Sequence, residues 1–112
     1  MAFTSVEKDQ LEAALVALDI EPTEEVMRQF LMFVVAIKVF EKKDKAYGSA
    51  WRKLGALNNL TRMATKVERL LEMFWHKQTW MTEDPDLDDA IDLLNYGGFF
   101  MQQAVDGEWT RG

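Results

Sequence analysis

Hydrophobic residues along this chain recur mainly at steps of three and four positions, the pattern of helices with one buried face. The short alternating runs that indicate strands are absent from the sequence. We therefore predict an all-α fold, in which residues 1–112 form one domain resembling a four-helix bundle. A further short helix is expected between the second and third helices. The predicted helices span about Thr4 to Asp19, Thr23 to Tyr47, Leu57 to His76 and Pro85 to Val105.

Capping residues support these boundaries. Thr4 and Glu7 have the spacing of a capping box, in which side chain and backbone exchange hydrogen bonds. Asp84 precedes Pro85, which predicts an N-cap followed by proline at the first helical position. Gly107 lies where a glycine C-terminal stop is expected.

The second predicted helix, which we expect to end at Gly48, changes character along one face. Its apolar stripe contains Met27, Phe30, Val34 and Ile37, and the same stepping continues to Glu41 and Asp44. These two carboxylates should therefore point roughly where the core points, and buried carboxylates need partners. The alternative is that the helix frays after Phe40 and that the lysine-rich segment 41–45 is a solvated end.

The fourth predicted helix carries acids deeper than capping requires. Its main apolar stripe is expected to contain Leu87, Ala90, Ile91, Leu94, Gly98, Met101 and Val105. Asp92 lies two turns into the helix, where the benefit from the helix dipole has faded. Asp89 and Asp92 are therefore expected to face another part of the protein or a second subunit. Acidic pairs at this spacing also occur by chance on solvated faces.

The third predicted helix has a core stripe of Leu60, Met63, Val67, Leu70 and Phe74. Arg62, Lys66 and Arg69 form a second line, which we interpret as a candidate phosphate-binding surface. Boundary cations also commonly extend along the edge of a core without binding a ligand.

The acidic pairs on the second and fourth helices suggest a metal site between facing helices. Glu41, Asp44, Asp89 and Asp92 are oxygen donors, which suit Mg²⁺ or Mn²⁺ better than zinc. A cation beside a basic line is an arrangement that triphosphate chemistry uses.

Composition narrows the function classes. The formal net charge of −6 argues against direct binding of long nucleic acids, which requires a basic surface. The absence of cysteine excludes disulfides and thiolate metal sites, and His76 is the single histidine. The sequence has no signal-peptide pattern and no apolar run of membrane-spanning length. We therefore expect a cytoplasmic protein without a membrane partner.

Aromatic residues and glycines add two weaker expectations. Tyr47 and Trp51 could stack on a nucleotide base, although aromatic residues are more often structural. Gly97 and Gly98 lie inside a predicted helix, at a cost of about 1 kcal/mol each relative to alanine. Such a pair predicts close approach of another helix, including one across a homo-oligomer interface.

Three segments resemble the nucleotide-modification-associated domain family of phages and bacteria: FEKKDKAYGSAWRKLG, LTRMATKVERL and DLDDAIDLLNYGGFF. The resemblance covers about residues 38–104. It implies that Arg62, Lys66 and Arg69 bind phosphate. It also implies that Tyr47, Trp51, Asn95 and Tyr96 contact a base or sugar.

The same layout is distantly similar to MazG-like all-α nucleoside triphosphate pyrophosphohydrolases, which hold Mg²⁺ with acidic motifs on two helices. The matching residues would be Glu41 with Asp44 and Asp89 with Asp92. The resemblance also implies a role in phage or bacterial nucleotide metabolism in the cytoplasm. Asp44 and Asp89 replace the usual glutamates of that pattern.

Three hypotheses follow. The first is a nucleotide-binding protein that hydrolyses (d)NTPs with Mg²⁺, in which Glu41, Asp44, Asp89 and Asp92 are catalytic. The second is a non-enzymatic helical protein that sequesters a nucleotide or binds a protein partner. It is favoured by Ala46 and Thr65, where many relatives have aspartate. The third is a structural bundle whose charges serve solubility.

Overall fold

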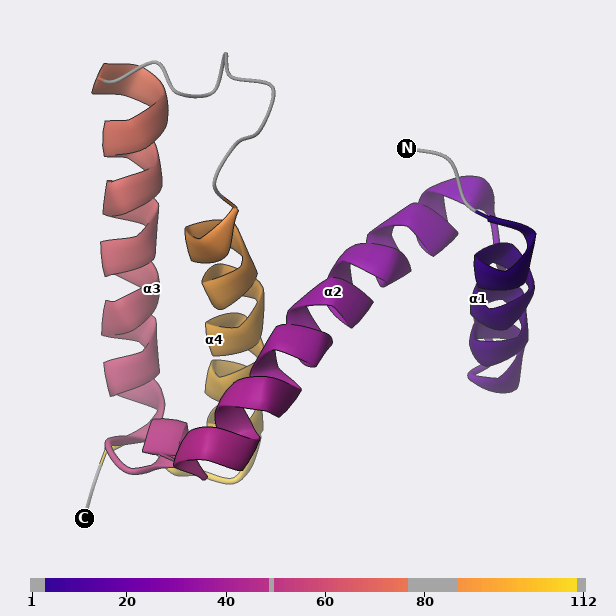
Figure 1. The fold of residues 1–112 in the computed structure, drawn as a ribbon. Coiled ribbons are helices and arrows are strands. Elements are labelled where there is room, and N and C mark those ends of the chain that lie inside the picture. Colours follow the sequence, from indigo (N-terminus) through magenta and orange to yellow (C-terminus); the bar gives the residue numbers. More distant parts are fainter. Residues whose placement is uncertain (1–3, 49, 77–86, 111–112) are drawn as a thin grey trace. The chain divides into compact units, whose positions relative to one another are not determined.

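The computed structural model describes residues 4–48, 50–76 and 87–110, except for the side chains of residues 47, 74 and 76. The helices are α1 (Ser5–Ala17), α2 (Glu24–Tyr47), the 3₁₀ helix η1 (Ala50–Arg52), α3 (Gly55–Leu71), the π-helix η2 (Glu72–His76) and α4 (Asp88–Val105). Within these residues there is no strand. The predicted all-α class and short intervening helix are thus confirmed (Figure 1).

The chain divides into two compact units, Met1–Val35 and Ala36–Gly112. In the first, α1 begins with the predicted capping box, since Thr4 Oγ1 accepts from the Glu7 amide at 3.1 Å. The helix ends through Asp19, which has a φ of 59°. Aspartate and asparagine tolerate this left-handed conformation better than most residue types.

The core of the first unit contains Leu11 and Leu15 of α1 and Met27 of α2. Val26, Phe30 and Leu31 pack against this core. α2 begins after Thr23, whose hydroxyl accepts from the Val26 amide at 3.2 Å. The predicted start of the second helix is therefore confirmed.

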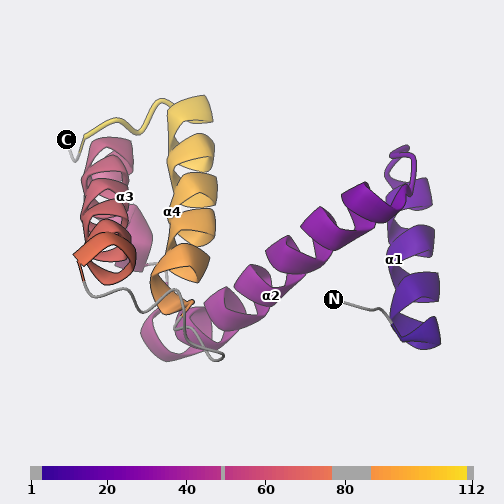
Figure 2. The same ribbon diagram turned by 90° about the horizontal axis from the view of Figure 1, so that it is seen from above.

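The second unit contains the end of α2, then η1, α3 and α4. α3 and α4 run antiparallel and side by side, as both views show (Figures 1 and 2). Gly48 and Gly107 end α2 and α4 with φ angles of 64° and 73°. The predicted N-cap Asp84 and Pro85 lie outside the described residues, and α4 is described from Asp88.

The first turn of α3 has no side-chain cap, and its backbone amides donate instead to carbonyls of the C-terminal segment. The amides of Ala56 and Leu57 donate to the carbonyls of Glu108 and Trp109 at 2.8 and 3.0 Å. Gly55, with a φ of 83°, permits this contact because a Cβ there would lie 2.8 Å from the Trp109 carbonyl oxygen. Helix N-termini need such acceptors for their free amides.

The packed faces of α3 and α4 differ from the predicted stripes. Leu60 and Val67 of α3 are 46% and 43% exposed, and Met101 and Val105 of α4 are 67% and 85% exposed. The packed face of α3 contains Ala56, Asn59, Met63, Lys66 and Leu70, and that of α4 contains Asp89, Asp92, Tyr96, Phe99 and Gln103. The predicted core stripes on both helices were therefore wrong in part, because paired polar residues occupy the interface.

The expected close approach at Gly97 and Gly98 is not found among the described residues. A Cβ at Gly97 would lie 3.8 Å from the Met63 methyl carbon, an ordinary contact. A Cβ at Gly98 would meet no described atom within 4 Å. Approach by a second copy of the chain remains a prediction.

Candidate functional site

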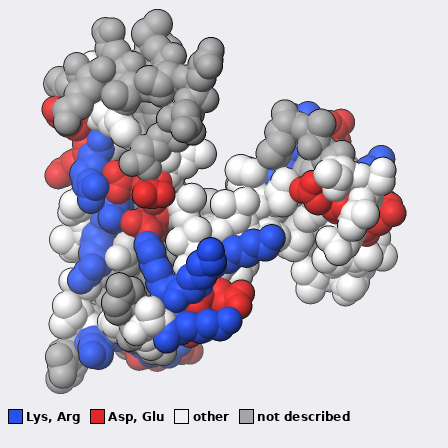
Figure 3. All heavy atoms as spheres, in the orientation of Figure 1, with Lys and Arg blue, Asp and Glu red and all other residues white. Residues whose placement is uncertain are grey.

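Acidic and basic side chains meet between α2, α3 and α4 in the second unit. Figure 3 shows Lys and Arg side chains beside Asp and Glu side chains over α3 and α4. We call Lys43, Lys66, Arg69, Asp89 and Asp92 the ion-pair cluster. It draws on three helices, because Lys43 lies in α2, Lys66 and Arg69 in α3, and the two acids in α4.

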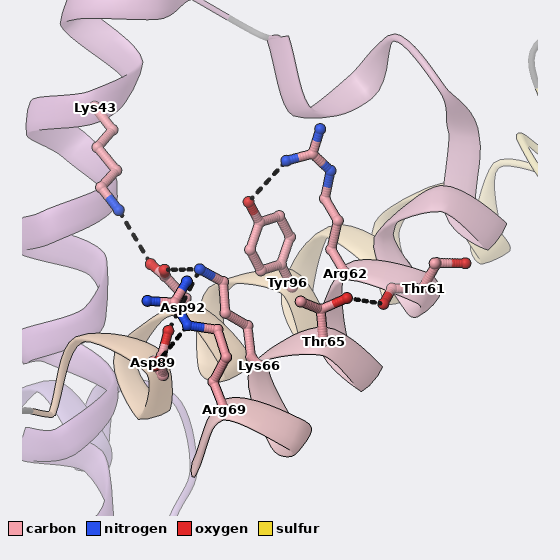
Figure 4. Close-up of polar contacts among 9 residues, drawn as sticks. All are labelled: Lys43, Thr61, Arg62, Thr65, Lys66, Arg69, Asp89, Asp92 and Tyr96. Atoms are coloured by element: carbon pink, nitrogen blue, oxygen red, sulfur yellow. Dashed lines mark hydrogen bonds and ion pairs between the residues drawn. The ribbon is translucent and has the colours of Figure 1, made fainter. Parts of the chain in front are cut away.

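Asp92 is the centre of the ion-pair cluster. Lys43 Nζ donates to Asp92 Oδ1 at 3.0 Å, and Lys66 Nζ lies 2.9 Å from Asp92 Oδ2. One carboxylate thus bridges two ammonium groups that belong to different helices (Figure 4). The prediction that Asp89 and Asp92 face another part of the protein is confirmed.

Asp89 completes the cluster one turn earlier in α4. Its Oδ1 lies 3.5 Å from Lys66 Nζ and its Oδ2 lies 3.4 Å from Arg69 Nε. Lys66 therefore contacts both acids, whereas Arg69 and Lys43 each contact one (Figure 4).

Exposure divides the ion-pair cluster into an inner and an outer part. The side chains of Asp89, Asp92 and Lys66 are 14%, 16% and 18% exposed, whereas Lys43 and Arg69 are 56% and 61% exposed. Exposed ion pairs stabilise proteins by about 0–1 kcal/mol. The Lys43–Asp92 contact is therefore the weaker of the two bridges to Asp92.

The pKa values of the inner groups reflect this arrangement. Burial would raise the pKa of Asp92, but hydrogen bonds from Lys66 and Lys43 outweigh it and hold that pKa below its ordinary value. The hydrogen bond to Asp92 outweighs burial at Lys66 and, with the charge of Asp89, raises the pKa of the lysine. Both groups are therefore charged at neutral pH.

A cavity of about 220 Å³ opens beside the ion-pair cluster. Its lining combines aromatic, amide and charged side chains from α2, η1, α3 and α4. The lining residues are Phe40, Lys43, Asp44, Gly48, Ala50, Trp51, Leu54, Asn58, Arg62, Asp92, Asn95, Tyr96 and Phe99. Lys43 and Asp92 therefore belong to both the cavity and the cluster.

Aromatic packing forms one wall of the cavity. Trp51 stacks on Phe99 with centroids 4.3 Å apart and an interplanar angle of 14°. The guanidinium carbon of Arg52 lies 4.7 Å from the Trp51 ring centroid, and Phe40 packs edge-on against the Trp51 ring. The predicted stacking of a base on Trp51 therefore requires Arg52 to move from the ring.

Two buried amides hold the turn that carries Trp51. Asn59 Nδ2 donates to the Trp51 carbonyl at 3.2 Å and to Gln103 Oε1. Gln103 Nε2 donates to the Arg52 carbonyl at 3.0 Å, and both amide side chains are 0% exposed. The Trp51 Nε1 atom is buried without a hydrogen-bond partner among the described residues.

Several predicted nucleotide contacts lie at the cavity. Arg62 Nη1 donates to Tyr96 Oη at 3.5 Å, and both side chains line the wall (Figure 4). Asn95 also lines it, but its Nδ2 donates to the Ala36 carbonyl at 2.9 Å, which leaves the amide oxygen for a ligand. The side chain of Tyr47 lies outside the described residues.

The two acids predicted on α2 behave differently. Glu41 is 61% exposed and pairs with Lys45 at 3.0 Å, so its expected orientation toward the core was wrong. Asp44 is half-buried and lines the cavity, and its carboxylate has no ion pair among the described residues. Glu41 therefore belongs neither to the cavity lining nor to the ion-pair cluster, unlike Asp44, Asp89 and Asp92.

The acids predicted to hold Mg²⁺ or Mn²⁺ are not gathered into one group among the described residues. No three acidic or histidine side chains among the described residues converge closely enough to hold one metal ion. Asp89 and Asp92 are instead neutralised by Lys66, Arg69 and Lys43. A divalent cation bound by Asp92 would have to displace the ion pairs of this carboxylate with Lys43 and Lys66.

Sequence reasoning missed Lys43, Asn59 and Gln103. Lys43 lies in segment 41–45, whose three lysines resemble a solvated helix end, and only the partner Asp92 distinguishes it. Asn59 and Gln103 are isolated polar residues, and the sequence has no spacing signal that pairs them. Their role depends on contacts across 44 residues of chain.

Comparison with protein-family models, curated proteins and solved structures finds no match to this chain. No described helix is long and apolar enough to span a membrane.

Proposed function

We propose that the second unit binds a nucleotide, with the base or sugar in the cavity and the phosphates over the adjoining cations. The observation that carries this proposal is the cavity lining, where aromatic and amide groups adjoin Lys43 and Arg62. Pockets of this kind bind ligands through apolar walls and a few well-placed polar groups. Arg and Lys are the usual partners of phosphate oxygens.

The cavity is large enough for one part of a nucleotide and too small for the whole molecule. Its volume of about 220 Å³ lies below the range of about 300–1,000 Å³ that is typical for drug-sized ligands. We therefore assign the cavity to the nucleoside part, with Asn95 and Tyr96 as its polar contacts. The phosphates would then lie outside it, toward Arg62, Lys66 and Arg69.

Binding can be tested by calorimetric titration of the protein with dNTPs and modified dNTPs, with and without Mg²⁺. Arg62→Gln should weaken binding about tenfold, because a charged hydrogen bond to phosphate contributes about 1.5 kcal/mol or more. The control is Arg28→Gln, which removes the same charge from the first unit, where Arg28 pairs with Glu24. Absence of binding by every nucleotide would disprove the proposal.

A second candidate is a (d)NTP pyrophosphohydrolase that depends on Mg²⁺ or Mn²⁺. One observation favours it: Asp44 of α2 and Asp92 of α4, one from each predicted acidic pair, both line the cavity. Turnover of nucleotide to monophosphate and pyrophosphate should then be lost in Asp92→Asn. Unchanged turnover in that variant, or nucleotide binding without turnover, would exclude this candidate and favour sequestration.

The expected setting remains a prediction as well. A cytoplasmic location in a phage-infected or bacterial cell is where free nucleotides would be met. Homo-oligomer formation can be checked by sedimentation of the purified chain.

A further inference from the structure

The carboxylate of Asp92 bridges two lysines. Lys43 and Lys66 approach different oxygens of Asp92 from different helices, at 3.0 and 2.9 Å. We propose that these two ammonium groups form a binding site for a phosphoryl group, and that Asp92 occupies this site when no ligand is bound. Asp92 would then be an internal competitor of the ligand phosphate.

The geometry supports this assignment. A carboxylate presents two oxygens on one carbon, and a phosphoryl group likewise presents several oxygens on one phosphorus. Lysine ammonium groups form charge-assisted hydrogen bonds with both kinds of oxygen. Two ammonium groups already spaced to hold one such group need little rearrangement to hold the other, which favours binding.

The exposures show how the exchange would occur. Lys43 is 56% exposed and lines the cavity, so a ligand can reach its ammonium group directly. Lys66 keeps a second contact with Asp89 at 3.5 Å, and Arg69 holds the other oxygen of Asp89. Displacement of Asp92 therefore leaves Lys66 and Asp89 paired, and only one carboxylate has to move.

The charges of the ion-pair cluster also favour an anion. Three cations face two carboxylates, so the cluster has one surplus positive charge. A phosphate group would be attracted by this surplus, in a protein whose formal net charge is −6. Replacement of Asp92 by a neutral residue would increase the surplus.

This inference rests on the proposed function only in taking the anion to be the phosphate of a nucleotide. It makes the opposite prediction from a metal-ligand role for Asp92. Removal of a metal ligand weakens binding of a metal–nucleotide complex, whereas removal of an internal competitor strengthens binding of an anion without metal.

The test is calorimetric titration with inorganic pyrophosphate in metal-free buffer containing a chelator. Asp92→Asn should bind pyrophosphate about tenfold more tightly than the wild type, which corresponds to about 1.4 kcal/mol. The control Asp9→Asn makes the same charge change in α1 and should leave the affinity unchanged. Because Lys43 is largely exposed, Lys43→Met should fold normally and weaken binding at least fivefold. Lys45→Met, which removes a 75% exposed lysine paired with Glu41, is its matched control.

The outcomes separate this inference from the proposed function. Equal or weaker pyrophosphate binding by Asp92→Asn, or a gain that persists when Lys43→Met is added, would overturn the inference. A gain that requires Lys43 would support it, even if no nucleotide bound to any variant and the proposed function failed. Nucleotide binding by the wild type without any gain in Asp92→Asn would leave the proposed function intact and overturn the inference.

Discussion

The ammonium group of Lys66 in α3 lies 2.9 Å from one carboxylate oxygen of Asp92 in α4, and 3.5 Å from a carboxylate oxygen of Asp89. All three side chains are less than 20% exposed. Lys66 is therefore the group that neutralises two partly buried acids at the α3–α4 interface. Its contacts make it a determinant of stability whatever ligand the cavity binds.

Replacement of Lys66 by methionine should destabilise the protein. The methionine keeps most of the side-chain volume but leaves Asp92 with Lys43 alone and Asp89 with Arg69 alone. Loss of a buried partner costs about 3–5 kcal/mol, and the partial exposure here reduces the expected loss to about 1–3 kcal/mol. Urea unfolding followed by circular dichroism measures it.

Lys45→Met is the matched control for this prediction. Lys45 is 75% exposed and pairs with Glu41 within one helix, so the expected change is within about 0.5 kcal/mol. Equal losses in Lys66→Met and Lys45→Met would show that the ion-pair cluster does not stabilise the interface.

The lowered pKa of Asp92 predicts a loss of stability in acid. Folding favours the charged carboxylate, so its contribution is fully present above the ordinary pKa of 3.8 and is lost as pH falls through the lower pKa of the folded state. The free energy of unfolding should therefore decrease as pH falls below about 4. Urea titrations of wild type and Asp92→Asn over this range test the point. The decrease should be smaller in the variant, and an identical decrease in both would contradict the assignment to Asp92.

Two leucines of α3 test which of its faces is packed. Leu60 is 46% exposed, whereas Leu70 is half-buried on the face toward α4. Leu70→Ala should cost about 1–3 kcal/mol, below the about 2–5 kcal/mol of a fully buried leucine. Leu60→Ala should cost less than about 1 kcal/mol. Thermal unfolding of the two variants provides the comparison, and a larger loss in Leu60→Ala would contradict the packed face of α3 described here.

The difference between these leucines shows what the sequence could and could not predict. Helix ends follow local rules, so Thr4 with Glu7, Gly48 and Gly107 gave the correct boundaries. The orientation of α3 and α4 depends on residues far apart in the chain. Lys66 belongs to a line of cations at the edge of the predicted core stripe, and its burial is favourable only because Asp89 and Asp92 of another helix provide its partners.

The candidate site likewise contains residues that the sequence predicts and residues that it does not. Asp89 and Asp92 were predicted to face inward because Asp92 lies too deep in its helix for capping. Lys43 was not predicted, because a lysine run at a helix end is ordinarily solvated. Glu41 follows the apolar stepping of α2 but is exposed, since helical spacing fixes only the direction of a side chain and not whether another element covers it.

The buried amide pair Asn59 and Gln103 provides the last prediction. Gln103→Met preserves length and removes the hydrogen bonds to Asn59 and to the Arg52 carbonyl. Asn59 Nδ2 keeps its hydrogen bond to the Trp51 carbonyl, so the main loss is the bond between the two amides, and the free energy of unfolding should fall by about 1–3 kcal/mol. Because the pair holds the turn that carries Trp51, the near-ultraviolet circular dichroism of the folded variant should also weaken. Gln102→Met, at an exposed neighbouring position, is the control and should retain both the stability and the aromatic signal. A Gln103→Met variant that loses stability but keeps the wild-type aromatic signal would show that the amide pair stabilises the unit without positioning the cavity wall.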